Sequence, residues 1–246
     1  MTSSQGRILV TDDDPSLRRA LNNTLHSMGF DVREAPDGEH ALKEIRRDPC
    51  DVVLLDVNMP GMGGVATCRE MRKMFPVVQI LMLSVRDRED EKVRALEAGA
   101  DDYVTKPFSV PELVARLKSA VRRATGVVPA AAKSIVIGEI ELDPERRTVL
   151  KRNVPLHLTP KEFDLLHYLM AHAGTPIPHR KLLNTVWGAE YGQELEYLRT
   201  FIYQLRKKLE DDPASPQYLF TDAWLGYRFR AVSSAAVPMP DSEPRN

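Results

Sequence analysis

The segment LLDVNMPGMGG, residues 54–64, determines how the first half of the chain folds. It runs from an apolar, strand-like stretch into Asp56 and then into a turn rich in Pro and Gly. A carboxylate at the end of a buried strand is costly unless a cation or hydrogen-bond donors lie close to it. Asp56 therefore predicts a functional site at this strand end, to which other parts of the chain contribute.

Short apolar runs alternate with amphipathic ones around this segment. The expected strands are 7–11, 31–35, 50–56, 77–84 and 101–105, and the expected helices are 15–28, 38–47, 64–74, 88–98 and 111–123. Pro15 and Pro111 suit first helical turns, while Gly29 and Gly99 suit helix C-caps. The alternation predicts an α/β doubly wound (βα)5 domain over residues 1–123. Its five-stranded parallel sheet should place a functional crevice at the carboxyl ends of the strands.

Reactive side chains follow four of these strands. Asp12 and Asp13 end the first strand, Asp56 the third and Ser84 the fourth, and Lys106 follows the fifth. In the strand order 2-1-3-4-5 these groups converge on one crevice. Any one of them alone is more often a cap or a surface residue, but together they form a chemical set. Clustered carboxylates favour Mg²⁺, and the hydroxyl and ammonium groups suit the oxygens of a phosphoryl group transferred to Asp56.

Residues 7–123 resemble the receiver domain of bacterial two-component response regulators. The matching segments are DD at 12–13, DVNMPGMGG from 56, LS at 83–84 and DDYVTKPF from 101. The resemblance implies that a sensor histidine kinase phosphorylates Asp56, that Ser84 and Lys106 hold the phosphoryl oxygens, and that Tyr103 is an aromatic switch. It also implies Mg²⁺ ligation by Asp13, Asp56 and the backbone carbonyl of Asn58, with Asp12 acting through a metal-bound water. Gly63 stands where many relatives have Asp.

Two other interpretations compete with this one. DDDPS at 12–16 resembles the DxDx[TV] nucleophile motif of haloacid-dehalogenase-type phosphatases. That enzyme interpretation leaves Asp56 and the second half of the chain without a role, so we do not expect an enzyme. The second alternative is a phospho-independent regulator or docking module that keeps the receiver fold, against which the intact acid, hydroxyl and lysine set argues.

The second half of the chain has a different pattern. Residues 124–134 are small and carry one charge, which is typical of a linker, and the Pro-rich tail 233–246 is expected to be disordered. Between them, 135–232 reads as strands in 135–158, helices near 160–172, 179–187 and 195–210, and a hairpin at 217–231. Residues 124–246 contain 15 Lys and Arg against 15 Asp and Glu, so DNA binding must rest on local patches.

The last expected helix has one apolar face, formed by Leu198, Ile202, Leu205 and Leu209, and an opposite polar face. A cationic helix followed by a hairpin predicts an α+β winged helix-turn-helix domain. Residues 135–231 resemble the effector domain of OmpR/PhoB-type regulators through LTPKEFDLL, Trp187-Gly188, LRKKLE and GYRF. From helix position we expect three residues in the major groove and four on the DNA backbone: Arg199, Thr200 and Tyr203, then Arg206, Lys207, Thr221 and Arg228.

The resemblance also implies the assembly. Phosphorylated receivers would form a homodimer through helix 88–98, strand 101–105 and helix 111–123, with cross-pairs of Lys92 with Glu112, Asp102 or Asp101 with Arg116, and Glu97 with Lys118. The dimer would bind double-stranded promoter DNA at tandem half-sites, and RNA polymerase is a further partner that the resemblance allows. The chain has no long apolar run and only two cysteines, so we expect a cytoplasmic protein with no membrane partner.

Overall fold

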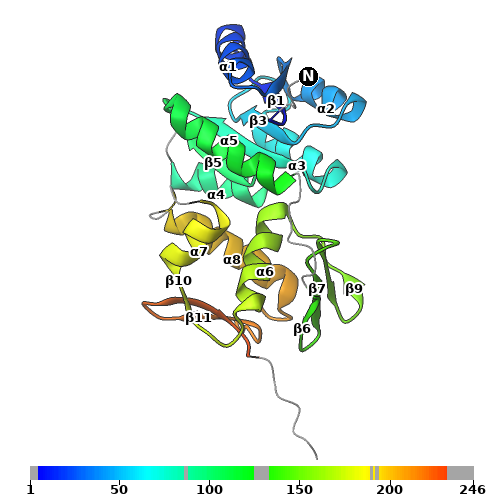
Figure 1. Ribbon diagram of the computed structural model, residues 1–246, viewed down its shortest axis with the longest axis vertical. Coiled ribbons are helices and arrows are strands. Elements are labelled where there is room, and N and C mark those ends of the chain that lie inside the picture. The colour runs from blue at the N-terminus through cyan, green and yellow to red at the C-terminus, as the bar shows by residue number, and fades with distance from the viewer. Residues whose placement is uncertain (1–4, 86–87, 125–132, 189–190, 192–193, 232–246) are drawn as a thin grey trace, which may run out of the picture.

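The computed structural model describes residues 5–85, 88–124, 133–188, 191 and 194–231 (Figure 1). The expected tail 233–246 and most of the expected linker lie outside these residues. Within them, no helix is both long and apolar enough to cross a membrane.

The first domain is the expected parallel sheet, with strand order β2-β1-β3-β4-β5. Its strands are β1 (Arg7–Thr11), β2 (Asp31–Ala35), β3 (Val52–Asp56), β4 (Gln79–Ser84) and β5 (Asp102–Thr105). Its helices are α1 (Pro15–Ser27), α2 (Gly38–Arg47), α3 (Gly64–Met74), α4 (Glu89–Glu97) and α5 (Val110–Ala124). The predicted fold class of this domain is confirmed.

Burial on both faces explains why the central strands are continuously apolar. Every residue of β3 and β4 is buried. One face of the sheet packs with Leu21 of α1 and Leu117 of α5, and the other packs with Ile45 of α2, Met71 of α3 and Ala95 of α4. Helices cover both faces, so only the strand ends are available for polar chemistry.

The second domain is the expected winged helix-turn-helix. A four-stranded antiparallel sheet precedes three helices, and a small sheet of order β10-β12-β11 contains the terminal hairpin. The strands are β6 (Ile135–Ile137), β7 (Ile140–Asp143), β8 (Thr148–Lys151), β9 (Val154–Pro155), β10 (Ile177–Pro178), β11 (Leu219–Asp222) and β12 (Gly226–Phe229). The helices are α6 (Pro160–Ala171), α7 (His179–Val186) and α8 (Leu195–Leu209).

Local sequence fixes where α6 begins. The Thr159 side chain accepts a hydrogen bond from Glu162 N, and the Glu162 carboxylate accepts one from Thr159 N, which is a capping box. Pro160 occupies the first turn, where its missing N–H costs nothing. This cap anchors the helix against which α7 and α8 pack.

The two domains contact each other through α4 and α8 (Figure 1). One continuous cluster of buried side chains runs from the receiver sheet through α4 into α6, α7 and α8. The second domain therefore covers part of the receiver surface formed by α4, β5 and α5, which we call the α4–β5–α5 face.

Candidate functional site

Four strand ends form a polar pocket at the carboxyl edge of the receiver sheet. Lys106 Nζ lies 2.7 Å from Asp12 Oδ2 and 2.5 Å from Asp56 Oδ1, so one ammonium bridges the ends of β1 and β3. The hydroxyl-bearing Ser84 ends β4 and is buried. The structure therefore brings together Asp12, Asp56, Ser84 and Lys106, which lie far apart in sequence.

Asp56 is held by a donor on each carboxylate oxygen. Oδ1 accepts from Lys106, and Oδ2 accepts from the backbone N–H of Asn58 at 2.7 Å. Burial raises the pKa of Asp56, and the ammonium of Lys106 opposes that rise only in part. Gly64 lets α3 start directly beside this strand end, because a Cβ there would lie 2.0 Å from the Asp56 carbonyl oxygen.

Lys106 responds to the same surroundings in the opposite sense. Burial alone would lower its pKa, but hydrogen bonds and charge from Asp12 and Asp56 more than offset burial and raise the pKa. The ammonium thus stays charged at neutral pH. It partly neutralises a pocket in which two buried carboxylates would otherwise repel each other.

The oxygen donors of this pocket suit Mg²⁺. Asp13 is exposed beside the buried Asp12, and the chain turns so that Asp14 N donates to Asp12 Oδ1 at 2.9 Å. Within the described ranges no three His, Cys, Asp or Glu side chains cluster as in an all-protein metal cage. Mg²⁺ commonly keeps several waters and uses only one or two carboxylates, so this donor set fits the ion without such a cage.

A buried ion pair lies at the other side of β5. Arg116 Nη1 lies 3.3 Å from Asp102 Oδ1, and both side chains are buried. Tyr191 of the second domain donates its hydroxyl proton to Asp102 Oδ2, and its ring lies 4.2 Å below the Arg116 guanidinium. Burial raises the pKa of Asp102, which Arg116 opposes. Two residues expected to pair between subunits are therefore paired within one chain, and Tyr191 contacts both of them.

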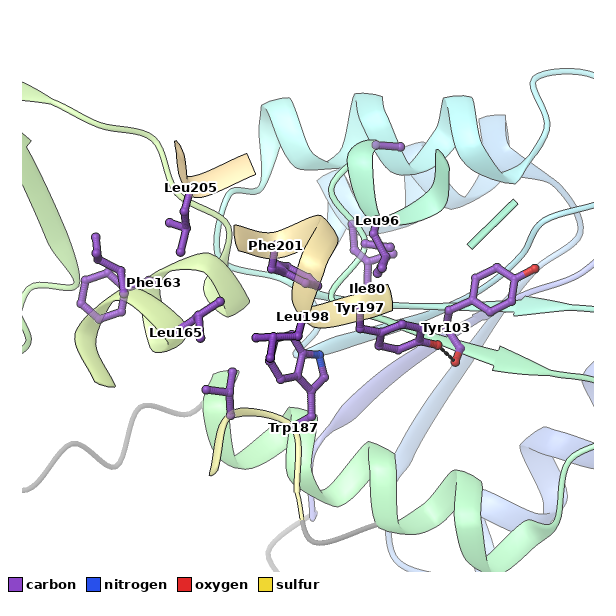
Figure 2. Close-up of a cluster of buried hydrophobic side chains, with 14 of the residues drawn as sticks. Ile80, Leu96, Tyr103, Phe163, Leu165, Trp187, Tyr197, Leu198, Phe201 and Leu205 are labelled. Atoms are coloured by element: carbon purple, nitrogen blue, oxygen red, sulfur yellow. Dashed lines mark hydrogen bonds between the residues drawn. The ribbon is translucent and has the colours of Figure 1, made fainter. Parts of the chain in front are cut away.

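Three further residues of the second domain bind the same receiver face, and Figure 2 shows two of them, Tyr197 and Trp187. The Tyr197 hydroxyl donates to the backbone carbonyl of Tyr103 at 2.6 Å, and the Trp187 indole donates to the backbone carbonyl of Asp101 at 3.3 Å. Gln204 Nε2 donates to Glu97 Oε1 at 3.3 Å. Tyr103, the expected switch, is buried in this contact region.

The remaining expected dimer residues divide into covered and accessible groups. Asp101 is buried just before β5 and binds Arg72 Nη2 at 2.6 Å, so Asp102 rather than Asp101 is the partner of Arg116. Glu112 also pairs with Arg116, at 3.0 Å within α5. Lys118 is exposed, and Lys92 is half-buried on α4. The cross-subunit pairs remain predictions, and several of their members already contact residues of the same chain: Asp101, Asp102, Glu112, Arg116 and Glu97.

The expected DNA-reading residues of α8 do not share one environment. Arg199 is exposed and pairs with Glu196 at 2.6 Å, and Tyr203 is 50% exposed with Lys207 Nζ 5.5 Å from its ring. Thr200 differs from expectation: it is only 8% exposed, and its hydroxyl donates to the Glu196 carbonyl. The helical period places it on the side of Tyr197 and Gln204, which faces the receiver.

Most of the residues expected to contact the DNA backbone bind other residues of the same chain. Arg206 donates to the Leu219 carbonyl at 2.8 Å and to the Thr221 hydroxyl at 2.8 Å, which ties α8 to β11. Arg228 pairs with Asp222 at 2.9 Å. Lys207 is exposed, and among these four residues it is the one best placed to meet a phosphate.

Nothing in the sequence predicts the roles of Tyr191, Tyr197 and Trp187. In the sequence these three aromatic residues look like ordinary core residues. Their hydrogen bonds to the receiver become visible only when one domain is placed on the other. The cue visible beforehand is that each ring combines apolar bulk with a donor, which suits residues at interfaces.

Comparisons with known proteins agree with this architecture. Residues 8–118 match the response regulator receiver domain, and residues 153–229 match the C-terminal domain of transcriptional regulatory proteins. The chain is 41% identical over 224 residues to the transcriptional regulatory protein KdpE of Mycobacterium tuberculosis, covering 91% of this chain and 99% of that one. It is 40% identical over 223 residues to the sensory transduction protein RegX3 of Mycolicibacterium smegmatis, covering 90% and 97%.

A solved structure of a RitR mutant superposes with a TM-score of 0.75 at 25% identity, covering 92% of this chain and 99% of that one. Both matched families are those of transcriptional regulators, and nothing favours a phospho-independent module. The chain belongs to the OmpR/PhoB-type response regulators and is a phosphorylation-dependent transcriptional regulator.

Proposed function

We propose that the closed arrangement of the two domains is the resting state and that phosphorylation of Asp56 opens it. The observation that supports this proposal is that the receiver face containing Asp102 and Arg116 is covered by the effector domain of the same chain. A face cannot bind its own effector domain and a second receiver at the same time. Closure and dimerisation therefore compete for the same surface.

The closed arrangement would also restrain DNA binding. Gln204 and Thr200 lie on the receiver side of α8, and α4 packs against this helix. A recognition helix must lie in the major groove, which is about 12 Å wide and admits one helix without a second one on its flank. Separation of α4 from α8 would free the recognition helix and the α4–β5–α5 face together.

The proposed chemistry uses the groups already in the pocket. A carboxylate oxygen of Asp56 attacks the phosphorus of a kinase phosphohistidine; the P–O bond forms as the P–N bond breaks, and the histidine nitrogen leaves with the electron pair and takes up a proton. Asp12, Asp13, Asp56 and the Asn58 carbonyl would hold Mg²⁺, which neutralises charge on the transferred group. Lys106 would exchange its carboxylate partners for a phosphoryl oxygen, and the Ser84 hydroxyl would donate to another.

The expected output is a homodimer on DNA. Two receivers would pair through the freed α4–β5–α5 faces, and two effector domains would bind tandem half-sites of double-stranded promoter DNA roughly one helical turn apart. We place this function in the cytoplasm, with RNA polymerase as a further partner.

Mass spectrometry of the intact protein tests the phosphoacceptor directly. With Mg²⁺ and a small phosphodonor the wild type should gain one phosphoryl group, located at Asp56 by peptide mapping, and Asp56→Asn should gain none. Equal labelling of the variant would refute the assignment. Asp13→Asn is a useful second variant, because it should still be labelled when Mg²⁺ is raised.

A further inference from the structure

A cavity lies where the receiver meets the effector domain. It has a volume of about 770 Å³ and is lined by the C-terminal half of α5, the turn between β7 and β8, α6 and the end of α7. Cavities of about 300–1,000 Å³ are of the size in which proteins enclose small organic ligands. The phosphorylation pocket and the recognition helix lie elsewhere, so neither of them uses this space.

The walls of the cavity are largely aromatic. Phe163, His167 and Tyr168 line it from α6, and Trp187 lines it from the end of α7. Burial lowers the pKa of His167, so its imidazole is neutral at pH 7 and contributes ring surface rather than charge. Walls of this kind suit a flat ring system, which gains from burial and from contact with other rings.

The charges on the walls are mostly positive. Three guanidinium groups line the cavity, those of Arg122, Arg123 and Arg147, against one carboxylate, that of Asp164. Arg147 Nη2 lies 2.7 Å from Asp164 Oδ1, so that carboxylate is already paired. The field in the cavity therefore favours an anionic ligand.

Arg123 is the residue that most favours an anion. Its guanidinium is half-buried and donates to two neutral groups, Ser119 Oγ at 2.6 Å and Gln79 Oε1 at 3.2 Å. No carboxylate of the described residues forms an ion pair with it, and burial lowers the pKa of Arg123. A cation withdrawn from water without a counter-charge is costly, and an anion bound in the cavity would offset that cost.

We infer that this cavity binds a small aromatic anion, such as an aromatic carboxylate, sulfonate or phosphate. The rings of the ligand would pack against Phe163 and Trp187, and its anionic group would accept hydrogen bonds from Arg123. An aromatic body and an anionic group are both needed, because the walls offer ring surface and guanidinium donors together.

Such a ligand would also hold the two domains together. Arg123 belongs to the receiver and Phe163 to the effector domain, and the domains already touch at the cavity, where Ser119 Oγ donates to the Trp187 carbonyl at 3.4 Å. A ligand that contacts both walls binds the closed arrangement more tightly than an open one, and so favours it. This part of the inference rests on the proposed function, in which phosphorylation opens the chain, whereas binding itself does not.

Two probes that differ by one charge test the inference. Anilinonaphthalene sulfonate is an aromatic anion, phenylnaphthylamine has the same rings without the sulfonate, and the fluorescence of both rises in an apolar site. The full-length unphosphorylated protein should bind the sulfonate at a single saturable site. Its affinity for the sulfonate should exceed that for the neutral probe by about 10- to 150-fold, the usual contribution of a hydrogen bond to a charged group.

Variants of the cavity separate charge from space. Arg123→Gln removes the charge and should abolish the preference for the sulfonate while leaving the neutral probe unchanged, and Arg123→Lys should retain most of the preference. Ala171 is an exposed residue of the cavity wall at the end of α6, so Ala171→Trp should fill the cavity and weaken both probes, with Ala171→Ser as its matched control. Melting temperatures near that of the wild type would show that the variants fold.

Phosphorylation tests the link between the ligand and domain closure. Linkage requires that a ligand which favours the closed arrangement bind an open chain less tightly. The wild type phosphorylated on Asp56 should therefore bind the sulfonate several-fold more weakly than the unphosphorylated chain. Asp56→Asn treated with the same phosphodonor should show no such change.

Equal affinities of the two probes for the wild type, or an unchanged sulfonate affinity in both Arg123→Gln and Ala171→Trp, would overturn the inference. A phosphorylated chain that expands in small-angle X-ray scattering yet keeps its affinity for the sulfonate would overturn it as well. A phosphorylated chain that neither expands nor releases the probe would instead contradict the proposed function.

Discussion

Tyr197→Phe removes a single hydroxyl from the contact between the domains. The Tyr197 hydroxyl donates to the Tyr103 carbonyl at 2.6 Å, and both residues are buried. A buried carbonyl that loses its donor costs about 1–3 kcal/mol, and it regains water when the domains separate. The cost therefore falls on the closed arrangement alone. The ratio of closed to open chains should fall about 5- to 150-fold.

DNA affinity of the unphosphorylated protein measures that shift. If only the open chain presents α8, the apparent Kd equals the intrinsic Kd divided by the open fraction. The variant should then bind more tightly than the wild type by up to the same factor, and small-angle X-ray scattering should show a larger radius of gyration.

Tyr218→Phe is the matched control. Its hydroxyl accepts from Glu139 N at 3.2 Å inside the effector domain, so its loss leaves the domain contact intact. If Tyr197→Phe and Tyr218→Phe have the same radius of gyration and both bind DNA like the wild type, the closed arrangement does not restrain DNA binding.

Three further predictions follow from the pocket, the receiver face and the recognition helix. Because burial raises the folded-state pKa of Asp56, ionised Asp56 costs stability above its ordinary pKa; Asp56→Asn should be more stable than the wild type in urea at pH 7, by a margin that shrinks as pH falls toward 4. A margin that grows on acidification would contradict this sign. Arg116→Glu places a second carboxylate beside Asp102, so light scattering of this variant should show no phosphorylation-dependent gain in mass. If the variant gains as much mass on phosphorylation as the wild type, dimers form through another surface. Lys207→Ala should weaken binding to all sequences alike and flatten the salt slope by about one, while Arg199→Ala should cost about 1–3 kcal/mol at one base position; identical effects of the two variants in anisotropy titrations would refute the division of roles.

The receiver could be predicted from sequence because its signals are local. The apolar run of β3 ends at Asp56, and the helix and strand periods alternate without interruption, so the sheet order brings Asp12, Asp56 and Lys106 together. The pocket needs no information beyond the strand ends. In a doubly wound parallel sheet the functional crevice lies at the carboxyl ends of the strands, so the residues that follow the strands can be placed from the sequence.

The domain contact could not be predicted in this way. Thr200 lies on a polar stretch of α8 and reads as an exposed residue, yet it is buried on the side of α8 that carries Tyr197 and Gln204, which bind the receiver. Asp101 and Asp102 are adjacent and chemically identical, but Asp101 precedes β5 and binds Arg72, whereas Asp102 begins the strand and binds Arg116. The hydrophobic period of a helix predicts which of its faces is buried. It does not predict how one domain packs on another, and therefore not which surface the second domain covers.

DNA binding by the phosphorylated protein tests the central claim most directly. Full-length wild type and Asp56→Asn are each incubated with Mg²⁺ and a small phosphodonor, and the extent of phosphorylation is read by mass spectrometry. Affinity for a labelled duplex, selected from a random-sequence library by the full-length protein, is measured on the same samples. The account predicts that affinity and radius of gyration rise together with the fraction of phosphorylated Asp56, and that the variant stays at the unphosphorylated wild-type level. A fully phosphorylated wild type that binds DNA no better than the unphosphorylated chain would contradict it.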